Sequence, residues 1–370
     1  MSNSQHPMAA YSAIRGPESA RLIIDGIPFL NFVGSCYLAQ QMHPTLMNAG
    51  RNALETAGAW YQIRTAAYSG CDPIFDDVAD AAARFFGTEA AVYMPSGYFA
   101  GPAAVSGLAG QFDVVVLDEL AHFSLVDAAR QSLLPTYVFP HLNADRLAEL
   151  LKSHGVAGHR PLLMTDGVFA TSGSIPPLAA YDRLVKEHGG QLFVDESHAY
   201  GVLGEHGRGA SEHCGVFALH GGSISKGICA HGGIFPCTQA FADRIKSRPP
   251  LRGVGAGSPI SAAVSAAALN LAQARPERRQ HLRNISQRLK TGLRGLGLKV
   301  ADTVAPITSF QAGLRADMQN LQRALFSHGI NVVISNYIGS GPEGVIRCAT
   351  FADHTESDID QLIAAIRELI

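Results

Sequence analysis

The chain has 370 residues, which is enough for a large hydrophobic core and a second, smaller domain. Its formal net charge is −2 and charged residues make up 16% of the chain, so the sequence offers no basic field to a nucleic acid or a membrane surface. Hydrophobic residues make up 47%, which is typical of a globular enzyme and excludes a largely disordered chain. We therefore expect neither a nucleic-acid partner nor a membrane partner.

Cysteine and histidine usage bears on the redox compartment and on metal binding. The 6 cysteines are scattered and form no C-x-x-C pair, which indicates reduced thiols in a cytoplasmic protein rather than disulfides or a zinc site. Residues 1–16 are polar and lack the apolar core of a signal peptide. No His-x-x-x-His or Cys/His cluster occurs, so we expect no metal; Asp195, Glu196 and His198 as ligands are the weaker alternative.

Apolar runs that alternate with helical patterns predict the fold of the first two thirds of the chain. Continuous apolar strands end in polar or turn residues at Ala90–Met94, Val114–Asp118, Pro161–Asp166 and Gln191–Asp195. Such strands are buried on both faces, which predicts an α/β protein with a mostly parallel sheet sandwiched by helices. Helices are expected over 76–86 and 178–188, each followed by glycine.

After about residue 260 the pattern changes. An Ala-rich stretch over 260–274 predicts a buried helix. Past a break at Pro276, basic residues predict a solvated helix face: Arg278, Arg279, Arg283, Arg288 and Lys290. Short strands at 309–312, 330–334 and 345–348 then mix with two helices, of which the last starts at a capping box of Thr355 and Asp358. We expect an N-terminal segment over 1–45, a large domain over 46–260, and a linking helix with a small C-terminal α/β domain over 261–370.

Two residues of the large domain point to a specific cofactor. Lys226 lies among glycines and small hydroxyl residues, and Asp195 ends a buried strand about thirty residues earlier. A lysine amine that forms a Schiff base and a carboxylate that keeps a pyridine nitrogen protonated are what pyridoxal 5'-phosphate chemistry needs. Asp195 alone could equally cap the next helix, but together with Lys226 and His198 it favours the cofactor role.

Other candidate residues follow strands as well. Ser96, Gly97 and Tyr98 open a helical stretch whose backbone N–H groups could bind a phosphate, and Ser223 could add a hydroxyl. The alternative for this segment is an ordinary βα turn. His122 could stack on a planar cofactor or be a structural histidine.

Arg347 interrupts an apolar strand of the small domain. A buried, unpaired arginine is costly, so it needs an anionic partner. A protein carboxylate and a substrate carboxylate both suit the fork geometry of its guanidinium.

The motifs around Asp195 and Lys226 together resemble one family. Segments 194–201, 207–209, 223–227 and 231–233 are similar to those of the α-oxoamine synthases, fold type I pyridoxal phosphate enzymes that condense an amino acid with an acyl thioester. The resemblance covers nearly the whole chain, and Asp353-His354 resembles the family's C-terminal signature. Segments 121–125 and 278–282 are closer to the bacterial quorum-sensing autoinducer synthases within this family.

The resemblance implies a role for each candidate residue. Lys226 would be the Schiff-base lysine and act as the base at Cα, Asp195 the ring-nitrogen partner, and His198 a contact to the ring hydroxyl. His122 would stack on the ring, and Ser96-Gly97-Tyr98 with Ser223 would hold the phosphate. Arg347 would bind the substrate carboxylate. The enzyme would be a homodimer that acts on an amino acid and an acyl-CoA or acyl-carrier thioester.

Three segments depart from the family pattern. Residues 66–73 replace a glycine- and serine-rich arginine motif, and Phe75 stands where a histidine is usual. Segment 255–259 has Ser258 as its hydroxyl residue where a Thr/Ser pair usually reaches the phosphate of the partner subunit. These departures leave another pyridoxal phosphate reaction open, such as aldol cleavage, β/γ-elimination or carbanion chemistry on S-adenosylmethionine.

Overall fold

The computed structural model describes residues 14–58, 60, 72–255 and 257–370. The chain divides into two compact units, each with its own hydrophobic core. The larger unit comprises Gln40–Phe169 and Ile175–Pro276, and the smaller comprises Met1–Ala39, Ala170–Ser174 and Glu277–Ile370.

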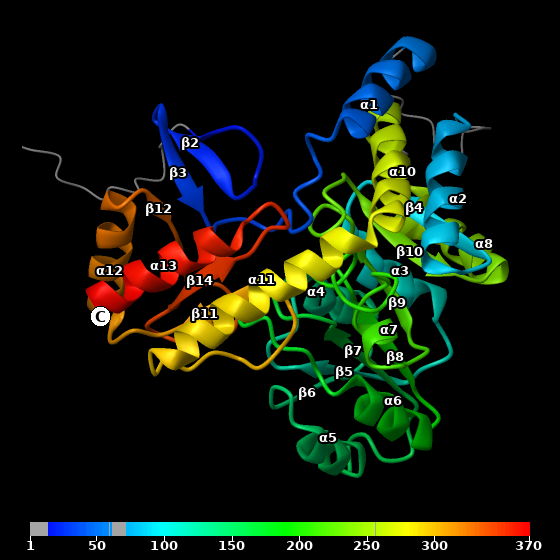
Figure 1. Ribbon diagram of the computed structural model, residues 1–370. Coiled ribbons are helices and arrows are strands. Elements are labelled where there is room, and N and C mark those ends of the chain that lie inside the picture. The colour runs from blue at the N-terminus through cyan, green and yellow to red at the C-terminus, as the bar shows by residue number, and fades with distance from the viewer. Residues whose placement is uncertain (1–13, 59, 61–71, 256) are drawn as a thin grey trace, which may run out of the picture. The chain divides into compact units, whose positions relative to one another are not determined.

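A seven-stranded sheet forms the centre of the larger unit (Figure 1). Its strands lie in the order β4 (Ala90–Met94), β10 (Gly233–Cys237), β9 (Leu219–Ser223), β8 (Gln191–Asp195), β7 (Pro161–Asp166), β5 (Val114–Asp118) and β6 (Thr136–Phe139). Strand β10 runs antiparallel to both of its neighbours, and the pairs from β9 to β6 are all parallel. The four strands predicted from apolar runs are β4, β5, β7 and β8, so these predictions are confirmed with their bounds.

Helices cover this sheet, and every residue of β5 and of β7 is accordingly buried. Leu162 and Met164 of β7 belong to one core with α3, α4 and α8, whereas Leu163 alternates to the opposite face. The helices of this unit are α1 (Pro44–Ala57), α2 (Ile74–Phe86), α3 (Ala100–Gly107), α4 (Phe123–Gln131), α5 (Ala144–Leu151), α6 (Leu178–Glu187), α7 (Ala210–His213), α8 (Gln239–Lys246), α9 (Pro249–Arg252) and α10 (Pro259–Ala274). The helices expected over 76–86, 178–188 and 260–274 are thus α2, α6 and α10.

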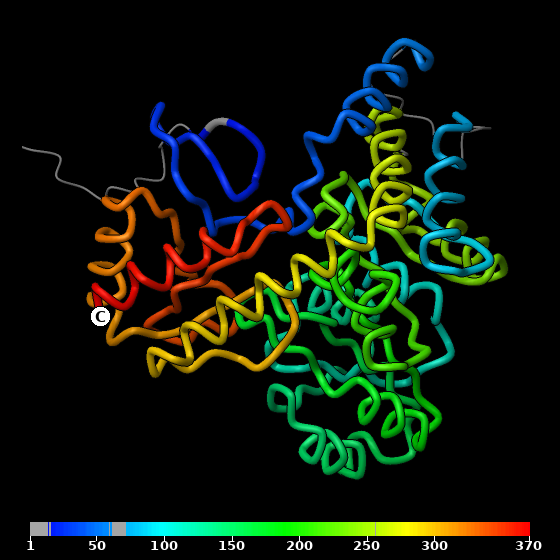
Figure 2. The backbone as a smooth tube through the Cα atoms, viewed as in Figure 1, coloured from blue at the N-terminus to red at the C-terminus, as the bar shows by residue number. Residues whose placement is uncertain are grey.

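The described residues of the smaller unit, from Ile14 on, form two further sheets and three helices. One sheet has the order β1 (Ile14–Arg15), β2 (Arg21–Ile24), β3 (Ile27–Asn31), β12 (Ile330–Asn331), and the other has the order β11 (Ile307–Phe310), β14 (Val345–Ala349), β13 (Val333–Ser335). The helices are α11 (Pro276–Gly295), α12 (Arg315–Ser327) and α13 (Glu356–Leu369), and the expected capping box of Thr355 and Asp358 begins α13. Figure 2 traces how the N-terminal strands lie beside β12.

This division differs from the expected domain boundaries at residues 45 and 260. Strand β3 pairs in parallel with β12, so the N-terminal strands belong to the same unit as the C-terminal part of the chain. Helix α10 packs against α1 and α2 and therefore belongs to the larger unit. The single strand expected over 330–334 is also corrected, because β12 and β13 join different sheets.

The expectation of a solvated basic face on α11 is wrong for three of its residues. Arg279 and Lys290 are 4% and 0% exposed, and Arg278 donates from Nε and Nη2 to the Leu38 carbonyl oxygen. Arg288 does lie on the surface, where it pairs with Glu356 and Asp360. The charge count alone gave no sign that neighbouring loops would supply carbonyl oxygens to the buried cations.

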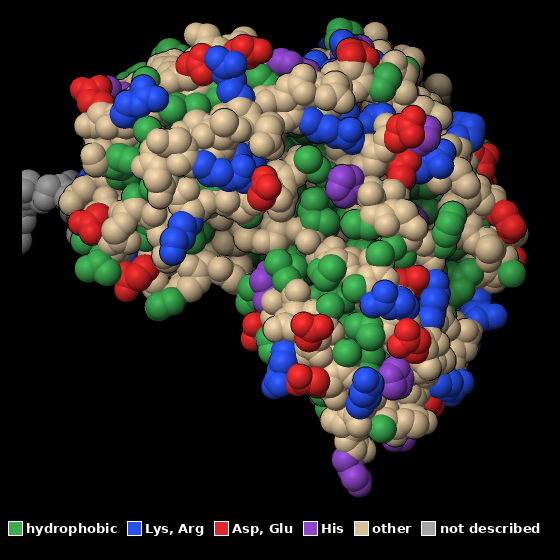
Figure 3. All heavy atoms as spheres, turned by 60° about the horizontal axis from the view of Figure 1, so that its bottom comes forward, with side chains coloured by type: hydrophobic (Ala, Val, Ile, Leu, Met, Phe, Trp, Pro, Cys, Tyr) green, Lys and Arg blue, Asp and Glu red, His purple; other side chains and the backbone are tan. Residues whose placement is uncertain are grey.

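The surface carries both signs of charge. On the face drawn in Figure 3, acidic and basic side chains are interspersed, in keeping with the net charge of −2. In the described part of the chain, every helix is too short or too polar to traverse a lipid bilayer. The 5 cysteines within the described residues are free thiols, and Cys71 lies outside them.

Candidate active site

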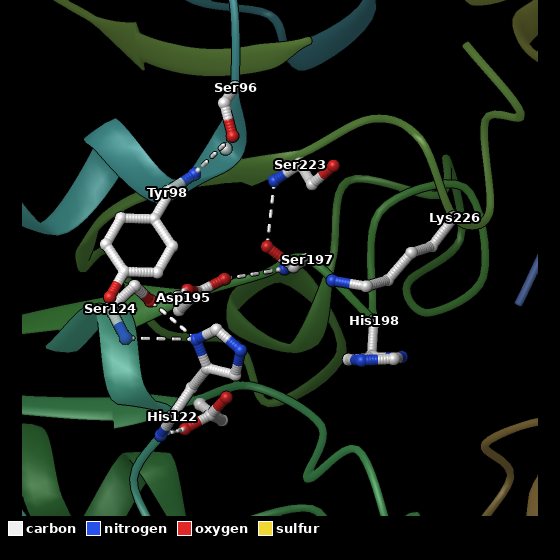
Figure 4. Close-up of a pocket in the computed structure, with 11 residues that line it drawn as sticks. Ser96, Tyr98, His122, Ser124, Asp195, Ser197, His198, Ser223 and Lys226 are labelled. Carbon is white, nitrogen blue, oxygen red and sulfur yellow. Dashed lines mark hydrogen bonds between the residues drawn. The ribbon is translucent and has the colours of Figure 1, made fainter. Parts of the chain in front are cut away.

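A cavity of about 170 Å³ opens at the carboxyl ends of the parallel strands of the larger unit (Figure 4). Chain segments that follow β4, β5, β7, β8 and β9 converge there, as expected for a ligand site in an open α/β sheet. The lining residues are Ser96, Gly97, Tyr98, His122, Ser124, Asp166, Asp195, Ser197, His198, Ser223 and Lys226. The structure thereby brings together eight residues predicted from the sequence: Ser96, Gly97, Tyr98, His122, Asp195, His198, Ser223 and Lys226.

Glycine 97 allows two hydroxyl-bearing turns to meet at one end of this cavity. A Cβ atom on Gly97 would lie 2.3 Å from the Ser223 nitrogen and 2.4 Å from its Cα, so no other residue fits. The Ser96 hydroxyl accepts a hydrogen bond from the Tyr98 N–H at 3.2 Å, and the Ser223 hydroxyl lies 2.6 Å from that of Ser225. These hydroxyl and N–H groups, which we call the Gly97 cradle, fit a phosphate.

The Tyr98 side chain contacts neighbours outside the cradle. Its hydroxyl donates to the Asp127 carboxylate, and this bond lowers the pKa of Asp127. Its ring lies edge-on to the His122 imidazole, with ring centroids 6.3 Å apart. The Tyr98 side chain is thus engaged by Asp127 and His122, and its backbone N–H by the Ser96 hydroxyl.

Asp195 is a buried carboxylate with two polar neighbours. It is 4% exposed, accepts a hydrogen bond from the Ser197 N–H at 2.9 Å, and lies 3.4 Å from the Ser124 hydroxyl. Such contacts hold the carboxylate in one orientation at the end of β8. This geometry fits a carboxylate that faces a protonated ring nitrogen.

Asp166 is a second carboxyl group that the sequence did not single out. It pairs with Asp195 in the β7–β8 register, and its Oδ2 accepts a hydrogen bond from the His122 N–H at 2.9 Å. Burial raises the pKa of Asp166 well above its usual range, and the neighbouring charge of Asp195 adds to the rise. Asp166 ends a buried strand just as Asp195 does, which is the signal that could have revealed it.

The His122 ring lies at the opposite side of the cavity from Lys226 (Figure 4). Its Nδ1 accepts a hydrogen bond from the Ser124 N–H at 3.2 Å, so the neutral ring carries its proton on Nε2. Burial lowers the pKa of His122; the Asp195 charge opposes this shift and the Lys226 charge adds to it. The backbone of His122 is held by the hydrogen bond to Asp166.

Lys226 extends its side chain into the cavity toward Ser197 (Figure 4). The turn that carries it is packed tightly, since a Cβ on Gly227 would lie 2.1 Å from the Tyr200 carbonyl oxygen. The Cys229 N–H closes the turn by donating to the Lys226 carbonyl oxygen at 3.0 Å. The glycine beside the lysine is therefore a packing requirement of the turn.

Glu196 holds the neighbouring loop in place, which speaks against the metal alternative. It is 0% exposed and accepts hydrogen bonds from the Ala210 N–H, the Ser211 N–H and the Ser211 hydroxyl. Burial raises its pKa to about 7. The slot it occupies needs glycine at positions 167 and 209, where a Cβ would lie 2.5 Å and 2.6 Å from its carboxyl group. Among the described residues, no group of three or more His, Cys, Asp or Glu side chains is arranged to hold a metal ion.

Arg347 lies on β14 in the smaller unit. Its Nε donates to the Ala170 carbonyl oxygen at 2.8 Å, Nη1 to the Gly34 carbonyl oxygen at 3.2 Å, and Nη2 to the Tyr37 hydroxyl at 3.4 Å. All three acceptors are neutral, and the ion pairs recorded for the described residues include no carboxylate partner for this guanidinium. The protein-carboxylate alternative thus has no support from the described residues, and two of the five guanidinium N–H groups are not used.

Comparison with known proteins gives the family. The chain matches the model of the aminotransferase class I and II family over residues 37–366. It belongs to that family.

The chain is similar to named enzymes over most of its length. The chain is 31% identical to the 8-amino-7-oxononanoate synthase of Geotalea daltonii over 95% of this chain and 91% of that protein. It is likewise 31% identical to the enzyme of the same name from Trichlorobacter lovleyi, over 99% of this chain and 95% of that protein. The solved Sphingomonas wittichii serine palmitoyltransferase matches with a TM-score of 0.87 at 26% identity, covering 96% of this chain and 92% of that chain.

These findings confirm the predicted class. The chain has the fold of a fold type I pyridoxal phosphate transferase, and pyridoxal phosphate is the cofactor of its class. The enzyme is a transferase of the α-oxoamine synthase type, whose reaction joins an amino acid to an acyl thioester through a new carbon–carbon bond.

Two family positions need separate comment. Ser258 is absent from the lining of the cavity; its hydroxyl caps α10 and donates to the Trp60 carbonyl oxygen at 2.8 Å. Phe75 is buried in the first turn of α2, where its ring lies 6.5 Å from that of Tyr93. The polar histidine usual in the family is thus replaced by a packing residue. Residues 66–71 and Ala256 of the two divergent segments lie outside the described residues.

Proposed function

We propose that this enzyme joins the α-carbon of a small amino acid to the acyl carbon of a thioester, with the thiol as leaving group and the amino-acid carboxylate lost as carbon dioxide, and releases an α-amino ketone. The cavity that gathers Lys226, Asp195 and the Gly97 cradle carries the proposal. The relatives' name agrees with it, because 8-amino-7-oxononanoate is an α-amino ketone whose terminal carbons match alanine without its carboxylate. The other relative's name pairs serine with a palmitoyl group.

Each lining residue has a distinct part in this proposal. Pyridoxal phosphate, when bound, supplies an aldehyde and an electron-withdrawing ring. Lys226 Nζ would hold the aldehyde and would take the proton from the substrate α-carbon. Asp195 would hold a proton on the ring nitrogen, and His198 would contact the ring hydroxyl. His122 would cover one face of the ring and exclude water from it.

The remaining residues bind anions. Ser96, Gly97, Tyr98 and Ser223 would hold the phosphate through hydroxyl and N–H groups, and Ser258 or the backbone N–H groups of its loop would reach the phosphate of the partner subunit in a homodimer. Arg347 binds the carboxylate of the amino acid with its unused N–H groups, held in place by three neutral oxygens. This role is supported because none of the ion pairs recorded for the described residues joins Arg347 to a carboxylate.

Three finer points stay predictions. The likeness of segments 121–125 and 278–282 to autoinducer synthases is one, since the relatives reported above carry other names. The cytoplasmic location expected from reduced thiols is another. The homodimer with sites near its interface is the third.

The reaction is tested by product analysis. Purified protein with pyridoxal phosphate is incubated with L-alanine or L-serine, with and without an acyl-CoA, and products are identified by mass spectrometry with carbon dioxide release measured in parallel. We expect an α-amino ketone that requires the acyl donor. Turnover of the amino acid at the same rate without a thioester would instead favour aldol cleavage or elimination. Borohydride reduction of the loaded protein should label the peptide of Lys226 and no other lysine.

A further inference from the structure

Lys290 of α11 is a buried cation whose partners are all neutral. It is 0% exposed, and its Nζ donates to the Thr303 carbonyl oxygen at 2.7 Å, the Thr303 hydroxyl at 3.0 Å and the Ala305 carbonyl oxygen at 2.6 Å. These three bonds use all three N–H groups of the ammonium. Burial lowers the pKa of Lys290 to about 7; the Arg294 charge adds to this shift and the Asp302 charge opposes it.

The loop that Lys290 binds also contacts the segment 170–174. The Thr303 hydroxyl donates to the Gly173 carbonyl oxygen at 2.8 Å. Gly173 has a φ of +69° and no room for a side chain, since a Cβ would lie 2.6 Å from the Ile307 carbonyl oxygen. Segment 170–174 therefore contacts both this loop and the start of β11 through Gly173.

The same segment orients Arg347. The Ala170 carbonyl oxygen accepts the hydrogen bond from Arg347 Nε at 2.8 Å, which is the shortest of the three bonds of that guanidinium. Ser309 of β11 pairs with Arg347 in the sheet. Lys290 thus binds Thr303, and Thr303 binds Gly173. Gly173 lies three residues after Ala170, whose carbonyl oxygen binds Arg347.

A second set of contacts holds the other side of the same loop. The Ser286 hydroxyl, one helical turn before Lys290, lies 2.6 Å from the Thr350 hydroxyl, and the Thr350 N–H donates to the Pro306 carbonyl oxygen at 2.9 Å. Thr350 follows β14, the strand of Arg347. The face of α11 formed by Ser286 and Lys290 therefore fixes the loop 303–306 against both the segment 170–174 and the end of β14.

We propose that Lys290 is a positioning residue for amino-acid binding, which acts by holding the segment 170–174 so that Arg347 presents its unused N–H groups to a carboxylate. The proposal rests on the proposed role of Arg347. Lys290 touches neither substrate nor cofactor in this scheme. Its removal should weaken amino-acid binding, because a misplaced binding group loses affinity steeply with small displacements.

The test compares Lys290→Met with wild type in the cofactor-loaded enzyme. Methionine fills a similar volume but donates no hydrogen bond. L-alanine and L-serine are titrated while visible absorbance is followed, and we expect the dissociation constant to rise about tenfold, with the absorbance before titration unchanged. Thr303→Val is a second variant; it removes the bridging hydroxyl and leaves Lys290 two carbonyl acceptors, so it should give a smaller rise in the same direction.

Arg294→Gln is the matched control. Arg294 lies one turn after Lys290 and binds the same connection at the Ala301 carbonyl oxygen and Asp302, and none of its recorded hydrogen bonds goes to Thr303 or Gly173. It should leave the dissociation constant unchanged. An equal weakening by Arg294→Gln, or a Lys290→Met protein that melts earlier but binds amino acids normally, would make Lys290 a purely structural residue and overturn the proposal.

A double-mutant cycle with Arg347→Leu separates the two proposals. If Lys290 acts through Arg347, the effect of Lys290→Met disappears in the Arg347→Leu background. Independent, additive losses would overturn the positioning role and leave Arg347 intact as the carboxylate ligand. Unchanged amino-acid binding by Arg347→Leu alone would overturn the proposed role of Arg347 itself.

Discussion

Asp195 and Asp166 end neighbouring strands in the same register, yet their surroundings differ. Asp195 receives hydrogen bonds from an N–H and a hydroxyl, whereas the recorded contact of Asp166 is one backbone N–H, that of His122. Burial raises the pKa of Asp166 well above its usual range, and the neighbouring charge of Asp195 adds to the rise. The two carboxyl groups at this edge of the sheet are therefore not equivalent.

This difference predicts unequal effects of the same substitution. Asp195→Asn should lower turnover by orders of magnitude while cofactor still binds, because a neutral amide cannot replace a charge-assisted bond in a water-poor site. Asp166→Asn should cost much less, since an amide oxygen still accepts the His122 N–H. Steady-state turnover and cofactor absorbance of both variants test this, and near-normal turnover of Asp195→Asn would refute the role of Asp195.

At the level of elements, the site depends on how closely the turn after β4 approaches the end of β9. The turns that carry Ser96 and Ser223 are distant in the sequence and approach each other because Gly97 and Gly233 have no side chains; a Cβ on Gly233 would lie 2.6 Å from the Gly97 Cα. Strand β10 lies between β4 and β9 and reverses direction, which sets the spacing of the two turns.

Gly97→Ala should therefore lose cofactor affinity. The added methyl group would overlap the Ser223 backbone and push the two turns apart, so the phosphate would lose donors on one side. Equilibrium titration of apoprotein with pyridoxal phosphate should give at least a tenfold weaker dissociation constant, about 1.4 kcal/mol. Gly295→Ala, at a position where a Cβ meets open space, should bind as wild type does; equal affinities in both variants would contradict the cradle.

For the whole molecule, buried histidines make stability sensitive to acid. Burial lowers the pKa of His220 and of His354 from 6.5 to about 4. The unfolded chain binds these protons between pH 6.5 and 4 and the folded chain does not, so their contribution to stability is present above pH 6.5 and is lost as pH falls toward 4. Glu196, with its raised pKa of about 7, has the opposite sign over much of this range.

A histidine variant isolates this contribution. His220→Asn retains an acceptor for the Tyr200 hydroxyl, which lies 2.8 Å from His220 Nδ1, but cannot be protonated. Urea unfolding at pH 7, 6, 5 and 4 should show a shallower loss of stability for His220→Asn than for wild type. The exposed His154→Asn is the control and should follow wild type; parallel curves for all three proteins would rule out His220 as a source of the slope.

Assembly is the other property of the whole molecule. If Ser258 or the N–H groups of its loop reach the phosphate of the partner subunit, cofactor affinity should fall when the dimer dissociates. Sizing across a dilution series, with cofactor absorbance followed in parallel, measures both. Full cofactor occupancy in a monomer would mean that one chain builds the whole phosphate site.

The sequence alone determined the sheet and the cofactor. Continuous apolar runs set the bounds of β4, β5, β7 and β8, because strands buried on both faces must be apolar throughout. Lys226 and Asp195 could be predicted as cofactor residues because the chemistry needs those residue types in glycine-rich and strand-end settings, and the structure places both in one cavity. The C-terminal helix was predictable from its capping box for the same reason, since the signal is local.

Tertiary structure decided everything that depends on residues far apart in the chain. Asp166 acquires its raised pKa, and Lys290 its burial, from neighbours that no local pattern specifies. The N-terminal strands belong to the smaller unit because β3 pairs with β12, about three hundred residues later in the chain, with Leu30 opposite Ile330. Periodicity reports which face of an element is buried, but the partner that buries it, and the charge it meets there, are set by packing.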